Sequence, residues 1–333
     1  MKTLTIKSFS DGYLEEILPF LSHATNAPYE YLPVHIRGVS LTRLWLHELR
    51  QTLENDGDVL AAALNREIVG IIAFAPLDWD TRVLQVPTTR ISHLSTIRAH
   101  LQSDVILDRL LRQALEQISS SGCSLVVARS SAQEAPVAHA LEEAGFRWQD
   151  TLLDYVYDGT TASLDNLELP DLEGEACIRS AEERDVNSLV ALAESAFGAH
   201  FGRFHADPRI GQQKAVTVYQ EWMRAAMAGY ADAVLVAEVE NRLAGCSIWK
   251  LPSRTESACG VHLGHYSIGA VDPAFSKRGL FTALTFAGMK VLEKSVGLIE
   301  GPTHVSNHAV QRAYARLRWS IRGARHSFHR WLM

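Results

Sequence analysis

The chain has few cysteines, and their arrangement fits neither a disulfide framework nor a metal site. The four cysteines lie far apart and form no C-x-x-C pair, at Cys123, Cys177, Cys246 and Cys259. This spacing favours reduced thiols over a disulfide-stabilised fold or a zinc ribbon. The fourteen histidines form no H-E-x-x-H motif, so we predict no metal site.

Long apolar runs and an excess of positive charge are also missing. No apolar stretch reaches the roughly 18 residues that can span a bilayer, and no basic and apolar leader opens the sequence. The formal net charge is −6 at pH 7, which argues against nucleic acid as a partner. We therefore expect a cytoplasmic monomer or homodimer that binds neither membranes nor nucleic acid.

What the chain does have is one order of helices and strands that occurs twice. With 333 residues, of which 47% are apolar, it can form two domains with separate cores. The first half predicts strands over 3–8, 59–64, 68–74, 90–97, 125–128 and 148–157, and helices over 11–21 (capped by Asp11), 42–53, 104–119 and 136–144. The second half predicts strands over 176–180, 233–239, 243–251, 262–271 and 298–303, and helices over 185–196, 216–227, 280–295 and 307–317.

A basic turn that contains a glycine lies between a predicted strand and a predicted helix of the second half. The segment comprises Val271 at the end of the strand, the turn residues Ser276, Lys277, Arg278 and Gly279, and Leu280, Phe281 and Thr282 at the start of the helix. A helix N-terminus leaves its first backbone N–H groups without partners, and the helix dipole favours an anion there. Glycine lets the backbone approach a ligand, and the two basic side chains add positive charge. The pattern predicts a site for a phosphate-bearing ligand.

A second segment, residues 307–319, predicts a short helix with two polar side chains on one face. Asn307 and Tyr314 are seven residues apart, which is close to two helical turns. Asn307 is also a good helix N-cap, and a helical tyrosine is most often part of the core. A functional role and a structural role therefore both stay open for these two residues.

Together, these segments resemble those of the GCN5-related N-acetyltransferases, or GNAT enzymes. In that family a pyrophosphate-binding turn of the form Arg/Gln-x-x-Gly-x-Gly/Ala follows the fourth strand, and a later helix carries an Asn and then a Tyr. Gly279, Asn307 and Tyr314 match this pattern. The departures are Ser276 in place of Arg or Gln, Phe281 in place of a small residue, and Arg318 with Trp319 in place of Gly-Phe.

The resemblance implies a fold, a cofactor and a set of residue roles. The implied fold is α/β with α+β layering, in which two tandem GNAT-like units each have a mixed, largely antiparallel sheet flanked by helices. The implied acyl donor is acetyl-CoA, bound by Val271, residues 276–282 and Asn307. Tyr314 would protonate the departing thiolate, and backbone N–H groups between separating strands would polarise the thioester carbonyl.

The two predicted units are chemically unequal. Residues 98–107 of the first unit stand where the glycine turn should be, but they contain no glycine, and Asp104 would repel a phosphate. Residues 134–144 lack a tyrosine. We therefore predict a degenerate N-terminal domain over 1–158, a linker over 159–174, and a catalytic domain that binds acetyl-CoA over 175–333.

The acceptor is predicted to bind near residues 196–208, where GNAT enzymes place a loop that covers the acceptor. This part resembles the TDP-fucosamine acetyltransferases and related sugar-nucleotide N-acetyltransferases. The predicted acceptor site comprises Arg203 for an anionic group, Phe204 for stacking, His205 or Asp207 as the base, and Tyr219 and Trp222. A simpler interpretation is that Asp207 and Pro208 begin a helix and that Arg203 is a solvated charge.

Other candidate bases have structural explanations that are more common. Glu221 and Glu238 are expected on an exposed helix face and at a strand edge. His262 and His265 precede the basic turn, and a satisfied core histidine is the more frequent outcome there.

These features predict an acetyl-CoA-dependent N-acetyltransferase that acts on a primary amine of a small molecule, with a nucleotide-linked amino sugar as the first candidate. Transfer would be direct, in a ternary complex, because no cysteine lies in a motif for an acetyl-enzyme. Two alternatives stay open at this point. One is a non-catalytic module that senses acyl-CoA or another nucleotide, and the other is an amine or peptide acetyltransferase.

Overall fold

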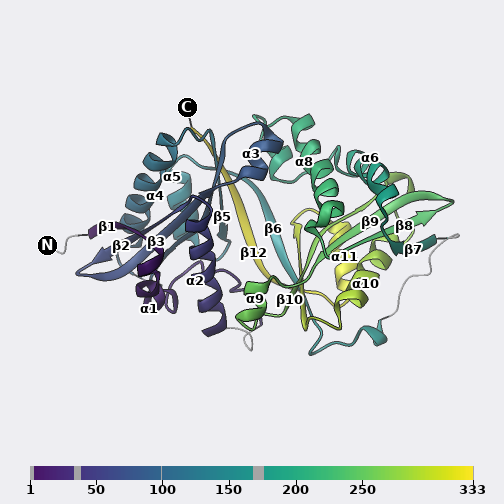
Figure 1. The fold of residues 1–333 in the computed structure, drawn as a ribbon, viewed down its shortest axis with the longest axis horizontal. Coiled ribbons are helices and arrows are strands. Elements are labelled where there is room, and N and C mark those ends of the chain that lie inside the picture. Colours follow the sequence, from purple (N-terminus) through teal and green to yellow (C-terminus); the bar gives the residue numbers. More distant parts are fainter. Residues whose placement is uncertain (1–3, 34–38, 99, 168–175, 333) are drawn as a thin grey trace. The chain divides into compact units, whose positions relative to one another are not determined.

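The computed structural model describes residues 4–33, 39–98, 100–167 and 176–332. The chain divides into two compact units, the first comprising Met1–Thr151 with Gly323–Met333 and the second comprising Leu152–Arg322. Each unit contains a mixed sheet with helices on both faces (Figure 1). The predicted fold class is therefore confirmed.

The sheet of the first unit has the strand order β1-β2-β3-β4-β5-β12. Its strands are β1 (Leu4–Phe9), β2 (Asp58–Leu64), β3 (Glu67–Pro76), β4 (Thr88–Thr96), β5 (Leu125–Ser131) and β12 (Ser320–Trp331). The pair β4 and β5 is parallel, and the other pairs are antiparallel. Side chains alternate between the faces. Val59 and Ala61 therefore pack with α2 (Val39–Glu54), and Leu60 and Ala62 pack with α4 (Ser103–Ser120).

The sheet of the second unit has the strand order β6-β11-β10-β9-β8-β7. Its strands are β6 (Arg147–Asp158), β7 (Ala176–Ser180), β8 (Ala233–Val239), β9 (Arg242–Lys250), β10 (Leu263–Val271) and β11 (Leu298–His304). Only β10 and β11 are parallel. One face packs against α6 (Val186–Phe197) and α8 (Gln212–Ala225), and the other against α10 (Leu280–Leu292) and α11 (His308–Arg316).

Each sheet is completed by a strand from the other half of the sequence. Residues 152–158 of β6, which end the first half, pair antiparallel with β11. Residues 325–331 of β12, which end the chain, pair antiparallel with β5. Neither sheet is therefore built from one continuous half of the sequence. The assignment of degenerate and catalytic roles to residues 1–158 and 175–333 stays a prediction.

Several local elements differ from the sequence expectation. Residues 11–21 form a 3₁₀ turn, η1 (Asp11–Ile17), followed by α1 (Leu18–Leu21), and Ser10 rather than Asp11 is the N-cap residue. The short helices α3 (Asp78–Leu84), α5 (Ala135–Glu143), α7 (Arg203–Ala206) and α9 (Arg254–Ala258) complete the helical elements named here, and α3, α7 and α9 were not expected. Residues 164–166 of the predicted linker form a 3₁₀ turn, and residues 168–174 lie outside the described residues.

In each unit the two strands of the parallel pair separate beyond their last shared rung. We call the opening between them the fork and the two diverging strands its arms. In the first unit the parallel rungs run from Thr88 with Leu125 to Ile91 with Ala128. In the second they run from Leu263 with Leu298 to His265 with Glu300. A β-bulge follows near the last rung in both cases, between Ile91 and His93 of β4 and between Tyr266 and Ile268 of β10. A bulge leaves one residue unpaired and bends the strand, which lets the two arms diverge.

The close packing of α10 on β9 gives a test of the second unit. A Cβ at Gly288 of α10 would collide with the indole of Trp249, which is fully buried. We expect Gly288→Ala to destabilise the protein by about 1–3 kcal/mol, because the indole cannot yield without moving its neighbours. Urea unfolding followed by tryptophan fluorescence measures this. Gly12→Ala is the control because no atom lies within 4 Å of its added Cβ, and equal midpoints for the two variants would contradict the packing argument.

Candidate functional site

The basic turn before α10 has two residues in the left-handed backbone conformation. Ser276 is extended, Lys277 has a φ of 66°, and Gly279, the N-cap residue of α10, has a φ of 78°. Glycine adopts this left-handed region without the steric penalty that a Cβ imposes. Two left-handed residues so close together turn the chain sharply and bring successive N–H groups to one side, as in anion-binding nests.

Six successive backbone N–H groups of this turn are without partners. Among the described residues, no acceptor bonds the amides of residues 277–282, and the Gly279 position has no side-chain cap. The first bond of the helix runs from Ala283 N to the Gly279 carbonyl oxygen at 3.0 Å. An unpaired helix N-terminus of this kind is suited to bind an anion.

Positive side chains lie in the turn and beside the residue that precedes it, Phe275. The guanidinium groups of Arg278 and Arg242 lie 5.4 and 5.3 Å from the ring centroid of buried Phe275. Lys277 is exposed. The predicted residues 276–282 therefore come together as one cradle with basic groups at its rim. Arg242, which is distant in the sequence, is an addition that the motif did not indicate.

Two tyrosine hydroxyls lie at the fork of the second unit, one against each arm. The Tyr314 hydroxyl lies against Gly301 of β11, 2.7 Å from where a Cβ would stand. The Tyr266 hydroxyl lies against Gly269 of β10 and is buried. The ring centroids are 6.2 Å apart. Tyr266 was missed by sequence reasoning because a strand tyrosine carries no motif.

Burial keeps both phenols protonated. Removal from water raises the pKa of Tyr314 well above its ordinary value, and the neighbouring Tyr266 and Tyr155 add to this effect. Burial also raises the pKa of Tyr266. Trp319 stacks on Tyr314 with centroids 4.6 Å apart, so this departure from Gly-Phe supplies a packing partner for the tyrosine. Each phenol can donate a proton at neutral pH.

Asn307 caps the helix that carries Tyr314. Its Oδ1 accepts a hydrogen bond from Val310 N at 3.4 Å at the start of α11. The cap fixes where α11 begins and hence where Tyr314 lies two turns later. The structural role is therefore present, and a contact between Asn307 and acetyl-CoA stays a prediction.

An ion cluster lies at the last rung before the fork opens. His265 Nε2 is 3.0 Å from Glu256 Oε1, and its Nδ1 is 2.7 Å from Glu300 Oε1. Burial opposes the charged imidazole, but the two carboxylates outweigh burial and raise the pKa of His265 to about 10. His265 is thus a satisfied histidine, as expected. Its partners were not foreseen because they come from α9 and β11.

The predicted acceptor segment forms an aromatic cluster beside the end of β11. Phe201 packs on His304 with centroids 4.6 Å apart, and Tyr219 stacks on Phe197 at 4.2 Å. Burial lowers the pKa of His205, and the backbone of Phe197 offsets part of this effect. Neither ring nitrogen of His205 makes a hydrogen bond of acceptable geometry among the described residues. A neutral, unbonded imidazole is able to accept a proton.

The other predicted acceptor residues are held by local contacts. The guanidinium of Arg203 lies 4.5 Å from the centroid of Phe204, whose side chain is buried. Asp207 is buried and accepts a hydrogen bond from Arg209 N at 3.0 Å. It follows α7 instead of starting a helix. Trp222, on α8, has a buried Nε1 without a partner among the described residues.

The two weaker base candidates are both in ion pairs. Glu221 pairs with Arg224 on α8. Glu238 pairs with Arg179, whose hydrogen bond lowers the pKa of Glu238. Each of these two carboxylates thus has a structural role in a local ion pair.

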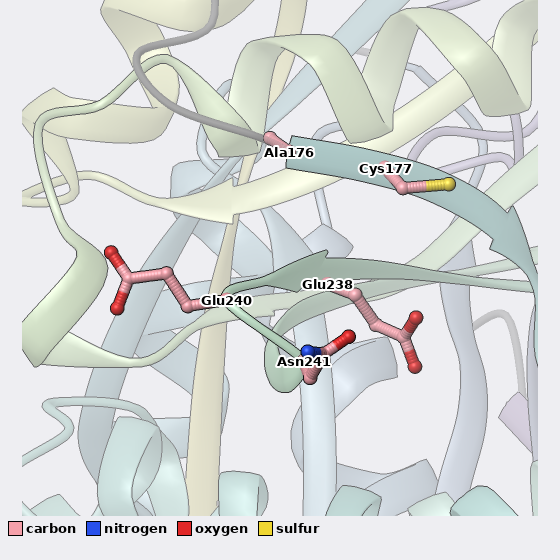
Figure 2. A pocket seen from close by; sticks show the side chains of 5 residues that line it. All are labelled: Ala176, Cys177, Glu238, Glu240 and Asn241. Atoms are coloured by element: carbon pink, nitrogen blue, oxygen red, sulfur yellow. The ribbon is translucent and has the colours of Figure 1, made fainter.

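A hollow of about 320 Å³ lies beside β7, the edge strand of the second sheet (Figure 2). It is lined by Ala176, Cys177, Glu238, Glu240 and Asn241. These residues come from β7, from the end of β8 and from the turn between β8 and β9. Glu238 is one of the weaker base candidates, but none of the residues predicted to bind the donor or the acceptor lines the hollow. We therefore do not take this hollow as the functional site.

The part of the chain that the structure describes contains no candidate metal centre and no candidate membrane span. No group of three or more His, Cys, Asp or Glu residues there is placed to hold a metal ion. No helix there has both the length and the apolar character to cross a bilayer.

The fold is similar to that of solved GNAT proteins. A GCN5-related N-acetyltransferase from Sphaerobacter thermophilus matches with a TM-score of 0.66 and 12% identity, over 98% of this chain and 95% of that one. A tandem GNAT protein from the clavulanic acid biosynthesis pathway matches with a TM-score of 0.61 and 13% identity, over 99% and 98%. A fungal glucosamine N-acetyltransferase region within a multi-domain protein matches with a TM-score of 0.66 and 14% identity, over 99% of this chain and 38% of that one.

No protein-family model and no curated protein matches the sequence. The structural similarities define the class: the chain has the fold of a tandem GNAT protein. At these identities they establish the fold alone.

The ion cluster at the fork predicts how stability depends on pH. The pKa of about 10 for folded His265 lies above the value of 6.5 for the free group. The ion pairs of His265 therefore contribute fully to the free energy of unfolding below pH 6.5, and this contribution is lost as the pH rises towards 10. Between pH 7 and 10, the free energy of unfolding of the wild type should fall more steeply than that of His265→Gln. Exposed His262→Gln is the control, and parallel curves for the wild type and His265→Gln would rule the cluster out as the cause.

Proposed function

We propose that the second unit is an acetyl-CoA-dependent N-acetyltransferase that acts on a primary amine of a small molecule. The observation that carries this proposal is the unpaired, basic turn at the end of β10, together with the Tyr314 hydroxyl at the fork of the same strand. Phosphates bound at the turn would direct the rest of the donor along β10 towards the fork. The acyl group would then lie between β10 and β11.

The bulge of β10 supports polarisation of the thioester. Ser267 lies between the register positions Tyr266 and Ile268 and has no partner on β9. On the other edge of β10, the parallel pairing with β11 ends at His265 and Glu300, so the backbone beyond His265 has no strand partner at the fork among the described residues. Backbone N–H groups aimed at a developing oxyanion are among the strongest contributors to acyl transfer.

The transfer itself needs one base and one acid. The neutral amine attacks the thioester carbonyl carbon, the C–S bond breaks, and the thiolate takes a proton. Tyr314, protonated at neutral pH and placed at the fork, is the proposed acid. His205 is the first candidate to accept the amine proton, because its ring nitrogens are unbonded and burial lowers its pKa. Asp207 is the second candidate.

The acceptor is proposed to be an amino sugar, with a nucleotide-linked one as the finer suggestion. The named activity of the fungal neighbour, glucosamine N-acetylation, supports an amino sugar as the first compound to test. The aromatic cluster of Phe201, Tyr219 and His304 offers surfaces on which a sugar ring can pack. Arg203, Phe204 and Trp222 complete the proposed acceptor site, with Arg203 for an anionic group.

A non-catalytic acyl-CoA sensor is the second candidate function. The observation that favours it is the packing of Phe281 near both fork tyrosines, with centroids 6.1 and 6.4 Å away. Phe281 replaces a small residue of the GNAT turn, so it narrows the approach to the fork. A sensor would bind the donor at the turn but would not transfer its acyl group.

Gly279→Asp tests donor binding. The aspartate places a carboxylate and a strained φ in the proposed phosphate cradle, so acetyl-CoA affinity should fall by about 100-fold or more, since like charges in contact cost several kcal/mol. Isothermal titration measures the loss. Gly211→Asp is the matched control, because Gly211 also has a positive φ at a helix N-cap in this unit. Equal affinity of the Gly279→Asp protein and the wild type would remove the cradle from the donor site.

Tyr314→Phe tests the acid. Loss of the hydroxyl should lower kcat for amino-sugar acetylation by about 100-fold, while the Kd of acetyl-CoA stays unchanged. Tyr155→Phe is the control because its ring packs on Tyr314, with centroids 5.1 Å apart. Full activity of Tyr314→Phe would move the acid role to another group, with Tyr266→Phe as the next variant.

A further inference from the structure

The fork of the first unit is occupied by the chain itself. After α1, the chain runs antiparallel to the end of β4, where Ala24 forms a bridge with Ile97. Thr25 N donates to the Thr96 carbonyl oxygen at 2.8 Å, and Arg98 N donates to the His23 carbonyl oxygen at 3.3 Å. We call residues 23–26 the strap.

The side chain of Asn26 spans the opening between the two arms. Its Nδ2 donates to the Leu94 carbonyl oxygen of β4 at 3.1 Å. Its Oδ1 accepts from Ser131 N of β5 at 2.8 Å. One side-chain amide therefore satisfies a backbone acceptor on one arm and a backbone donor on the other. This is the bonding that an amide-bearing ligand would make in the same place.

Asparagine suits this position for a second reason. Asn26 has a φ of 50°, a left-handed conformation that asparagine tolerates better than most residues with a Cβ. Ala24 and Thr25 are buried. The strap is thus a packed part of the first unit.

The fork of the second unit has no equivalent strap. Counted from the bulges, Leu94 and Thr96 of β4 correspond to Gly269 and Val271 of β10. Among the described residues, no backbone N–H of the segment that follows α6 donates to the Gly269 or Val271 carbonyl oxygen. That segment instead contacts the end of β11 through Phe201. In both units the parallel pair separates beside a bulge, and among the described residues the backbone bridge of the first fork has no counterpart in the second.

The start of α4 is closed in a similar way. His100 N and Ser103 N donate to the carbonyl oxygens of Ile97 and His100, and Gln102 N donates to His100 Nδ1 at 3.2 Å. The first turn of α4 also carries Asp104. Counted from the first residue of each helix, residues 100–105 correspond to the cradle residues 277–282, and three of these six amides are bonded before α4. Asp104 adds a negative charge at this position.

We propose that the strap takes the place of a ligand in the first unit, so that each chain binds one acyl donor, at the second unit only. The claim that the donor binds at the second unit rests on the proposed function. The claim that the strap takes the place of a ligand concerns the first unit alone and can be tested without a ligand.

Binding stoichiometry tests the whole statement. Titration of the full-length protein with acetyl-CoA, followed by native mass spectrometry, should give one donor per chain for the wild type and none for Gly279→Asp. Two donors per chain for the wild type, or one remaining in Gly279→Asp, would overturn the strap as a replacement for ligand. If the wild type binds no acetyl-CoA, the proposed function is overturned. The role of the strap is then tested by the hydrogen-exchange experiment described next.

Hydrogen exchange tests the strap directly. Asn26→Ala removes both bridging bonds, so the Ser131 amide should exchange at least about 10-fold faster than in the wild type, because a lost partner exposes it to local opening. Asn65→Ala is the matched control, since Asn65 is an exposed asparagine with a φ of 53° in a hairpin turn.

Asn26→Asp separates loss of the bridge from loss of the fold. The carboxylate can still accept from Ser131 N but cannot donate to the Leu94 carbonyl oxygen. The Ser131 amide should therefore stay protected in Asn26→Asp and lose protection in Asn26→Ala. Unchanged Ser131 exchange in Asn26→Ala would show that the strap does not hold the fork.

Discussion

Two parallel strands share backbone hydrogen bonds only while they remain adjacent, and in this protein one such pair separates in each unit. Past Ile91 in the first unit and His265 in the second, the facing N–H and C=O groups lose their strand partners. Buried backbone groups must be paired by something. The first unit pairs them with Asn26, whereas the second leaves its arms without such a strap. The unequal roles proposed for the two units derive from this one constraint.

The second unit places three chemical features along the same pair of strands. The anion cradle follows β10, the Tyr266 and Tyr314 hydroxyls lie against the two arms, and the His265 cluster lies at the last rung. Helix α10 connects the cradle to the core because Gly288 lets it pack directly on Trp249. The packing of α10 therefore fixes the position of the cradle, because a shift of this helix would move the cradle relative to the fork.

Charge is distributed so that each part of the site suits a different step. The cradle combines unpaired amides with Arg242 and Arg278, which favours phosphate. The phenol of Tyr314 stays protonated because it is buried, whereas burial keeps the imidazole of His205 neutral. Burial raises the pKa of the proposed acid and lowers the pKa of the proposed base. Opposite pKa shifts of this kind distinguish the acid from the base in other active sites as well.

The sequence by itself determined the order of most elements, the basic turn at residues 276–279 and the helix that presents Tyr314, but it did not predict α3, α7, α9 or β12. These features are local, because hydrophobic period, a glycine and an N-cap act within a few residues. Only the tertiary structure decided that β6 and β12 complete the sheets of opposite halves, since both strands follow the same pattern. It alone also brought Glu256 and Glu300 to His265, and Asn26 to Ser131. Such pairings join residues far apart in the chain, and their partners are chosen by packing rather than by any neighbouring residue.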